Sequence, residues 1–148
     1  GGFPIGALTT KSEYMALFKD KPILGHITTF GGHPVIAAAA YTNLKETLNS
    51  NLMLKIENKE KLIRKTLKHK LILEIRGKGL MLALILNDSI LTKKLVEGCL
   101  DNGLILFYLL FEPKAVRITP PLTISENEIN EGCKIILNVL DDIQKHVH

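Results

Sequence analysis

Gly25-His26-Ile27-Thr28-Thr29-Phe30-Gly31-Gly32-His33-Pro34 is the stretch around which the rest of the chain is organised, because it ends where a long helix begins. Pro34 suits the first turn of a helix, where a missing N–H costs nothing and the fixed φ is already helical. The alanines at residues 37–40 have the highest helix propensity of any residue. The sequence therefore predicts a helix over residues 34–48.

The loop before this helix has the chemistry of an anion-binding site. The first turn of a helix carries unpaired N–H groups and the positive end of a dipole, and Gly31 and Gly32 let a ligand approach the backbone closely. Thr28 and Thr29 add hydroxyl donors just upstream. The same residues also suit an ordinary helix-entry turn, because Thr and Gly are common turn and capping residues. From the residues alone, both interpretations stay open.

Length and composition indicate a globular protein. The 148 residues could form one domain or part of a larger protein, and an apolar content of 46% is ample for a packed core. The formal net charge of +4 is mild, and the lysines are spread along predicted helices, which argues against nucleic-acid binding. No apolar run approaches the roughly 20 residues that span a bilayer, so we expect no membrane association and a cytoplasmic location.

The two cysteines, Cys99 and Cys133, form no Cys-x-x-Cys pair and have no His at a metal-binding spacing. We expect both to be free, buried thiols, and we expect no metal site.

On either side of the central stretch the chain changes character. Residues 5–10 read as a short strand, and Ser12 can cap a helix that runs through Phe18. After residue 48, the cluster Asn49-Ser50-Asn51 predicts a bend before a second helix to about residue 69. This second helix is rich in lysine, so we expect it to be mostly solvated. A domain boundary is predicted near residue 49.

Beyond residue 69 the pattern predicts a small α+β unit with helices on one face of a sheet. Asp88 or Ser89 should cap one helix, which ends at Asn102, and Ser125 and Glu128 form a capping box for the last helix. The predicted strands cover residues 71–76, 80–86, 104–111 and 115–119, with the second buried on both faces and with turns at 77–79 and 112–114.

Four motifs, in this order, resemble those of the class III aminotransferases, the pyridoxal-phosphate family of the acetylornithine and ornithine enzymes. Besides the central stretch they are Gly1-Gly2-Phe3-Pro4-Ile5-Gly6-Ala7, Ile75-Arg76-Gly77-Lys78-Gly79-Leu80-Met81 and Val116-Arg117-Ile118-Thr119-Pro120-Pro121-Leu122. The resemblance implies part of a fold type I pyridoxal-phosphate-dependent transferase of α+β class. Residues 1–48 would be the tail of the large cofactor-binding domain with the connecting helix, and residues 49–148 the C-terminal small α+β domain.

The resemblance also implies roles for three residues. Thr29 matches the family threonine that binds the cofactor phosphate across the dimer interface, and Thr28 is a second candidate. Arg117 matches the arginine that binds the substrate α-carboxylate, and its planar fork suits that task. As a strand residue it should face away from its neighbours Val116 and Ile118. Pattern alone would also allow a surface arginine at a sheet edge.

Other residues of the motifs have weaker assignments. His33 stands where many relatives have Asn, and His26 is as consistent with a structural role as with a functional one. Arg76 and Lys78, beside two glycines, are interpreted as structural. No catalytic residue is assigned, because the family's Schiff-base lysine lies upstream of the first motif. The 148-residue chain by itself is therefore expected to be inactive.

The implied function is transfer of an amino group between an amino acid, such as acetylornithine or ornithine, and a 2-oxo acid. Pyridoxal phosphate would be the cofactor, and a homodimer the active form. Amino donors like 4-aminobutyrate, or β-amino acids, stay open. The alternative is a non-catalytic α+β module that binds an anionic ligand or a partner protein.

Overall fold

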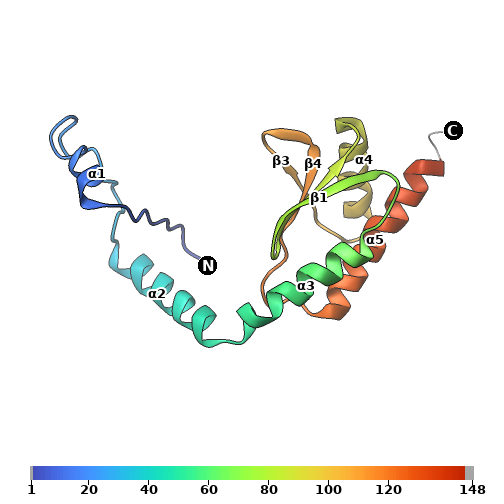
Figure 1. The fold of residues 1–148 in the computed structure, drawn as a ribbon, viewed down its shortest axis with the longest axis horizontal. Coiled ribbons are helices and arrows are strands. Elements are labelled where there is room, and N and C mark those ends of the chain that lie inside the picture. Colours follow the sequence, from blue (N-terminus) through green and yellow to red (C-terminus); the bar gives the residue numbers. More distant parts are fainter. Residues whose placement is uncertain (1, 146–148) are drawn as a thin grey trace. The chain divides into compact units, whose positions relative to one another are not determined.

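The computed structural model describes residues 2–145 and divides the chain into two units, Gly1–Ser50 and Asn51–His148. Figure 1 shows the helices and strands of each unit in chain order. The assignment of residues 1–48 to the tail of a large domain and of residues 49–148 to a small domain stays a prediction.

The described residues of the first unit form the helices α1 (Ser12–Ala16) and α2 (Pro34–Asn49). The long helix begins at Pro34, as the sequence predicts. The strand predicted at residues 5–10 is wrong, because these residues form no regular structure, and α1 stops short of Phe18. No described residue of this unit is buried, so the described part of the unit has no hydrophobic core of its own.

The described residues of the second unit form the helices α3 (Leu52–Thr66), α4 (Ser89–Asp101) and α5 (Glu126–Lys145). The predicted break between the first two long helices is confirmed, since α2 ends at Asn49 and α3 begins at Leu52. Both caps predicted for this unit are also present, whereas the cap predicted at Ser12 is wrong, because Ser12 is the first residue of α1 and Lys11 occupies its N-cap position. The Asp88 carboxylate accepts a hydrogen bond from the Leu91 N–H at 2.8 Å, and residues 125 and 128 form the reciprocal bonds of the capping box.

An antiparallel sheet of four strands in the order β1-β2-β4-β3 completes this unit. The strands are β1 (Ile72–Lys78), β2 (Met81–Leu86), β3 (Phe107–Leu109) and β4 (Glu112–Ile118). Two turns lie at other residues than the sequence predicts. The first hairpin turns at residues 79–80, and the second turns at residues 110–111 instead of 112–114.

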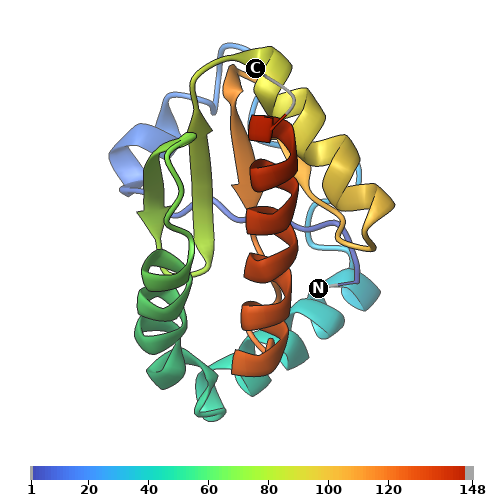
Figure 2. The same ribbon diagram turned by 90° about the vertical axis from the view of Figure 1, so that its right-hand side faces the viewer.

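The hydrophobic core lies between one face of the sheet and the helices α4 and α5, which cover that face (Figure 2). The prediction that β2 is buried on both faces holds only for its last residues, because Met81 is 78% exposed and Ala83 is half-buried. Cys99 and Cys133 are free and buried in this core, as predicted, and burial raises the pKa of each thiol to about 11. The largest fully buried side chains are Leu84, Leu86, Leu95, Leu140 and Val116.

Helix α3 holds the β1–β2 hairpin through a charged pair. Glu60 Oε1 accepts from Arg64 Nε at 2.8 Å, and Glu60 Oε2 accepts from the Gly79 N–H at 2.6 Å. The Arg64 guanidinium also donates to the carbonyl oxygens of Ile75 and Gly77. The bond from Arg64, followed by that from Gly79, holds the pKa of the Glu60 carboxyl below its usual value.

No helix among the described residues is both long enough and apolar enough to cross a membrane.

Replacing Gly77 with Ala should destabilise the protein strongly. Gly77 has a φ of +107°, and a Cβ atom there would overlap the carbonyl oxygen of Met81. Gly103 provides the matched control, because its φ is +82° but a Cβ there meets no atom within 4 Å. We expect Gly103→Ala to lower the free energy of unfolding by about 1 kcal/mol and Gly77→Ala by more than about 2 kcal/mol in denaturant titrations. Equal losses would contradict this account.

Candidate functional site

Arg117 lies on an interior strand of the sheet, with its side chain on the face opposite to the helices. Its neighbours Val116 and Ile118 are buried in the core, with exposed fractions of 0% and 8%, whereas Arg117 is exposed. The predicted alternation is therefore confirmed. The alternative of an arginine at a sheet edge is wrong, because β4 is paired with β2 on one side and β3 on the other.

The register of the sheet sets the surroundings of the Arg117 guanidinium. Arg117 is directly opposite Ala83 on β2 and opposite Phe107 on β3, so these side chains share one face. Ala83 leaves space on one side of Arg117, and Phe107, which is 62% exposed, supplies an apolar wall on the other. A planar anion could reach the guanidinium from this open face and accept two parallel hydrogen bonds.

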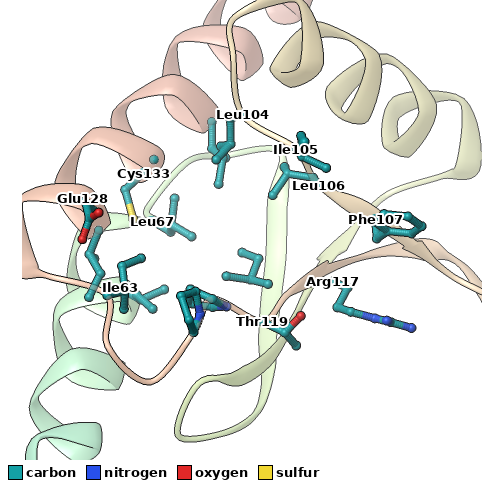
Figure 3. A pocket seen from close by; sticks show the side chains of 17 residues that line it. Ile63, Leu67, Leu104, Ile105, Leu106, Phe107, Arg117, Thr119, Glu128 and Cys133 are labelled. Carbon is teal, nitrogen blue, oxygen red and sulfur yellow. The ribbon is translucent and has the colours of Figure 1, made fainter. Parts of the chain in front are cut away.

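A cavity of about 450 Å³ lies beneath the same strand end. Its walls come from α3, α5, the segment before β3, the ends of β3 and β4 with Phe107 and Arg117, and the residues that follow β4, and most of the side chains are aliphatic. Figure 3 shows Leu104, Leu67 and Cys133 lining this cavity, while the Arg117 side chain points away from it. An anion bound by Arg117 would therefore lie on the open sheet face, outside the cavity.

The second candidate site, the loop of Thr28 and Thr29, belongs to the first unit. Both threonines are exposed, and the described residues offer neither hydroxyl a hydrogen-bond partner. A tight turn follows, in which the Gly31 N–H donates to the Thr28 carbonyl oxygen at 3.1 Å and Gly32 has a φ of +73°. A small cavity of about 210 Å³ lies beside this turn, at the start of α2.

These features fit a phosphate group. Thr28 lines this cavity together with residues of the first turn of α2, whose leading N–H groups have no partner within the helix, and Thr29 is its neighbour in the chain. His33 occupies the N-cap position, but its side chain makes no capping bond and so does not compete for those N–H groups. Thr28 and Thr29 can therefore donate to phosphate oxygens without breaking an existing bond.

The structure corrects the interpretation of the glycine-rich motif at residues 75–81. Arg76 and Lys78 are exposed, and the Arg76 guanidinium pairs with the exposed Glu74, at 2.8 Å. The structural role belongs instead to Gly77 and Gly79, which both have positive φ and lie against α3 or β2. The solvent-exposed pair of Arg76 with Glu74 contributes little to stability.

Lys59 is the residue that the sequence interpretation missed. The lysine-rich helix was expected to be mostly solvated, yet Lys59 is only 7% exposed. Its ammonium group donates to the Leu122 carbonyl oxygen at 2.7 Å. The spacing of Ile56, Lys59 and Ile63 could have predicted this burial, because residues three and four apart lie on one face of a helix. Both isoleucines pack on the core.

Among the described residues, no group of three or more His, Cys, Asp or Glu side chains is placed to hold a metal ion.

Comparisons with known proteins give the geometry a family context. The family model "Aminotransferase class-III" matches residues 1–140. The chain belongs to the class III aminotransferase family. The motif resemblance found in the sequence is thereby confirmed, and the cofactor of this family is pyridoxal phosphate.

Individual relatives agree. The chain is 37% identical to an acetylornithine aminotransferase of Caldanaerobacter subterraneus over 97% of its own length and 36% of that enzyme. It is 34% identical to a succinylornithine transaminase of Yersinia pseudotuberculosis, over 89% of the chain and 32% of that enzyme. The chain thus spans about a third of the length of the curated relatives it matches.

The fold is likewise that of the family. A crystal structure of a Bacillus anthracis aminotransferase superimposes with a TM-score of 0.75 and 28% sequence identity, over 89% of this chain and 34% of the other. The predicted fold class, part of a pyridoxal-phosphate-dependent transferase, is therefore confirmed.

Proposed function

We propose that the enzyme of which this chain is a part transfers an amino group between an amino acid and a 2-oxo acid. The observation that carries the proposal is Arg117, an exposed guanidinium fixed on the open face of an interior strand, within a family of aminotransferases. A 2-oxo acid, and the amino acid formed from it, bear a carboxylate next to the reacting carbon, and Arg117 can bind that carboxylate with two parallel hydrogen bonds.

For the amino donor we propose an ornithine derivative. The names of the relatives support this, since they act on acetylornithine or succinylornithine. Donors like 4-aminobutyrate and β-amino acids are the alternatives. Transamination assays with each candidate donor would distinguish them from an ornithine derivative.

The cofactor site would be completed between two subunits. We propose that Thr29, with Thr28 beside it, binds the phosphate of pyridoxal phosphate in the site of the neighbouring subunit of a homodimer. Pyridoxal phosphate, when bound, supplies the electron sink that makes the proton shift of transamination possible. Thr28 and Thr29 would hold the phosphate in place, and Arg117 would orient the carboxylate, so that the reacting groups meet in a fixed geometry.

The rival proposal is a non-catalytic module that binds an anion or a partner protein. The exposed loop of Thr28 and Thr29 would serve either function, because free hydroxyls beside a helix N-terminus bind many anions. A transamination assay separates the two proposals.

The 148-residue chain alone should show no transamination. The resemblance places the cofactor-binding lysine of the family before the first motif, so residues 1–148 do not include it. The proton shift of transamination needs that amine. The assay uses the purified chain with pyridoxal phosphate, acetylornithine and a 2-oxo acid, and the full-length enzyme is the positive control. Turnover by the chain alone would contradict the prediction.

Arg117→Ala should weaken binding of amino acid substrates in the full-length enzyme. Removing one partner of a charge-assisted pair in a closed site costs about 2 to 5 kcal/mol, which corresponds to a loss in kcat/KM of about 30-fold or more. Arg117→Lys should also be impaired, because one ammonium cannot reproduce the planar fork. The exposed Arg76 offers a matched control on the same sheet, and Arg76→Ala should leave kcat/KM within about twofold. If Arg117→Ala left kcat/KM unchanged, Arg117 would have no substrate role.

Thr29→Ala should weaken the affinity for pyridoxal phosphate about 10-fold to 100-fold. One hydrogen bond to a charged phosphate contributes roughly 1.5 to 3 kcal/mol, and its loss leaves the remaining chemistry possible. The measurement is the dependence of activity on the concentration of added cofactor, in full-length enzyme.

Mixed dimers test whether Thr29 acts across the subunit boundary. We would combine Thr29→Ala subunits with subunits that lack the cofactor-binding lysine. If Thr29 acts in trans, the lysine-bearing site receives an intact threonine from its partner, and each mixed dimer regains one complete site at low pyridoxal phosphate. If dimers form but regain nothing, Thr29 acts within its own subunit or only at the helix entry.

A further inference from the structure

Lys59 occupies a position on α3 where an apolar side chain would be expected. It lies between Ile56 and Ile63 on the face of the helix that packs on the core, and it is 7% exposed. Burying a charged group costs free energy unless the group is hydrogen-bonded. The neighbouring Lys61, by contrast, is exposed and forms an ordinary surface pair with Glu57. A buried lysine within an otherwise solvated run of lysines calls for a specific role.

The partner of Lys59 lies far away in the sequence. Its Nζ atom donates to the Leu122 carbonyl oxygen at 2.7 Å, and no carboxylate of the described residues forms an ion pair with it. The bond therefore joins the middle of α3 to the segment that connects β4 with α5. At the end of that segment, the Glu128 carboxylate accepts two bonds from Ser125, both at 2.7 Å. These bonds, with a smaller contribution from the charge of Lys59, lower the pKa of Glu128.

Arg117 stands at the last rungs of the sheet. The β3–β4 ladder ends at the pair Phe107 and Arg117, and the β2–β4 ladder ends one residue later, at Ile118. The chain then runs into Pro120 and Pro121, which have no N–H to donate. The ends of ladders open more readily than their centres. The strand end that carries Arg117 therefore needs a fixed point beyond the ladder.

The bond to Leu122 supplies that fixed point. Three residues, Thr119, Pro120 and Pro121, lie between the end of β4 and Leu122. The two prolines have a fixed φ, and the proline that follows Thr119 restricts Thr119 to extended conformations. A connection this stiff transmits the position of Leu122 to the end of β4. The prolines alone cannot do so, because they restrict the local conformation without attaching it to the rest of the fold.

We propose that Lys59 is a positioning residue for Arg117, which acts by fixing the exit of β4 against α3 through the Leu122 carbonyl group. The inference rests on the proposed function, in which Arg117 binds the substrate carboxylate. Lys59 itself touches no substrate, since its ammonium group is committed to the backbone of the connecting segment. Its effect reaches the substrate only through the backbone that carries Arg117.

The test is a double-mutant cycle in the full-length enzyme. Lys59→Met, which keeps an unbranched side chain but ends one atom short of Nζ and has no donor, should raise KM for the 2-oxo acid about tenfold while kcat stays within about twofold. Lys59→Arg, which keeps a cationic donor, should restore KM. Adding Lys59→Met to Arg117→Ala should cause no further loss, because the Arg117 side chain is then already absent. Lys61→Met is the matched control and should behave like the wild type.

Hydrogen exchange on the same proteins gives a readout that does not need activity. Lys59→Met should speed exchange of the backbone amides in residues 115–124 by about tenfold and leave residues 95–101, whose amides are bonded within α4, unchanged. Lys59→Gln, whose donor ends one atom short, should give the same pattern and replaces Lys59→Met if that variant folds poorly.

The outcomes separate the two proposals. Unchanged exchange in residues 115–124, or losses from Lys59→Met and Arg117→Ala that multiply in the double variant, would overturn the role of Lys59. Inactive wild-type enzyme, or an Arg117→Ala variant with normal kinetics, would overturn the proposed function, and exchange would still decide whether Lys59 fixes the strand end.

Discussion

Burial of the helix-facing side of β4 is the constraint on which the candidate substrate site depends. Val116 and Ile118 are buried in the core, and successive side chains of a strand point to opposite faces of the sheet. The Arg117 side chain must therefore lie on the open face. A slip of one residue in register would bury the guanidinium and expose both aliphatic side chains. The apolar contacts on one side of the sheet thus determine where a charged group stands on the other.

Helix α3 supports this sheet with polar groups as well as apolar ones. Glu60 and Arg64 bind the backbone of the β1–β2 hairpin, and Lys59 binds the backbone beyond β4. Each of these bonds ends on a backbone carbonyl or N–H group of the hairpin or of the segment that connects β4 with α5. Such bonds add little net stability, but an unpaired group at these positions would be costly. Their effect is to specify where loops and strand ends lie, which apolar packing alone does less precisely.

The sequence predicted those parts of the fold that depend on local chemistry. The helix start at Pro34, the Asp88 cap and the capping box at Ser125 are local patterns, and all are present. The turn between β3 and β4 was misplaced because its residues, Leu110 and Phe111, carry no turn signal, whereas Pro113 does. Pro113 is instead tolerated within the strand, because it is paired in neither ladder.

The candidate site divides in the same way. The face on which Arg117 stands followed from strand alternation, but its neighbours Ala83 and Phe107 depend on pairing between segments distant in the sequence. The role of Lys59 could not be read from composition, because a lysine-rich helix is normally solvated. The 3.6-residue period of the helix does place Lys59 among the core-facing positions. Its partner Leu122 is known only from the fold, because the two residues are far apart in the sequence.

The two candidate sites differ in what fixes their shape, and this difference governs how substitutions in them should be interpreted. Arg117 stands in a unit with its own core, so its geometry is determined by contacts inside that unit. Thr29 stands in a unit in which no described residue is buried and in which large apolar side chains such as Phe30 and Tyr41 are exposed. Exposed apolar surface of this kind is stabilised by covering it. The precise shape of the Thr29 loop is therefore expected to depend on whatever covers its unit. If Thr29 binds the cofactor and Arg117 the substrate, as proposed, a change at Thr29 should act on cofactor affinity and on assembly together, whereas a change at Arg117 should act on substrate binding without disturbing assembly.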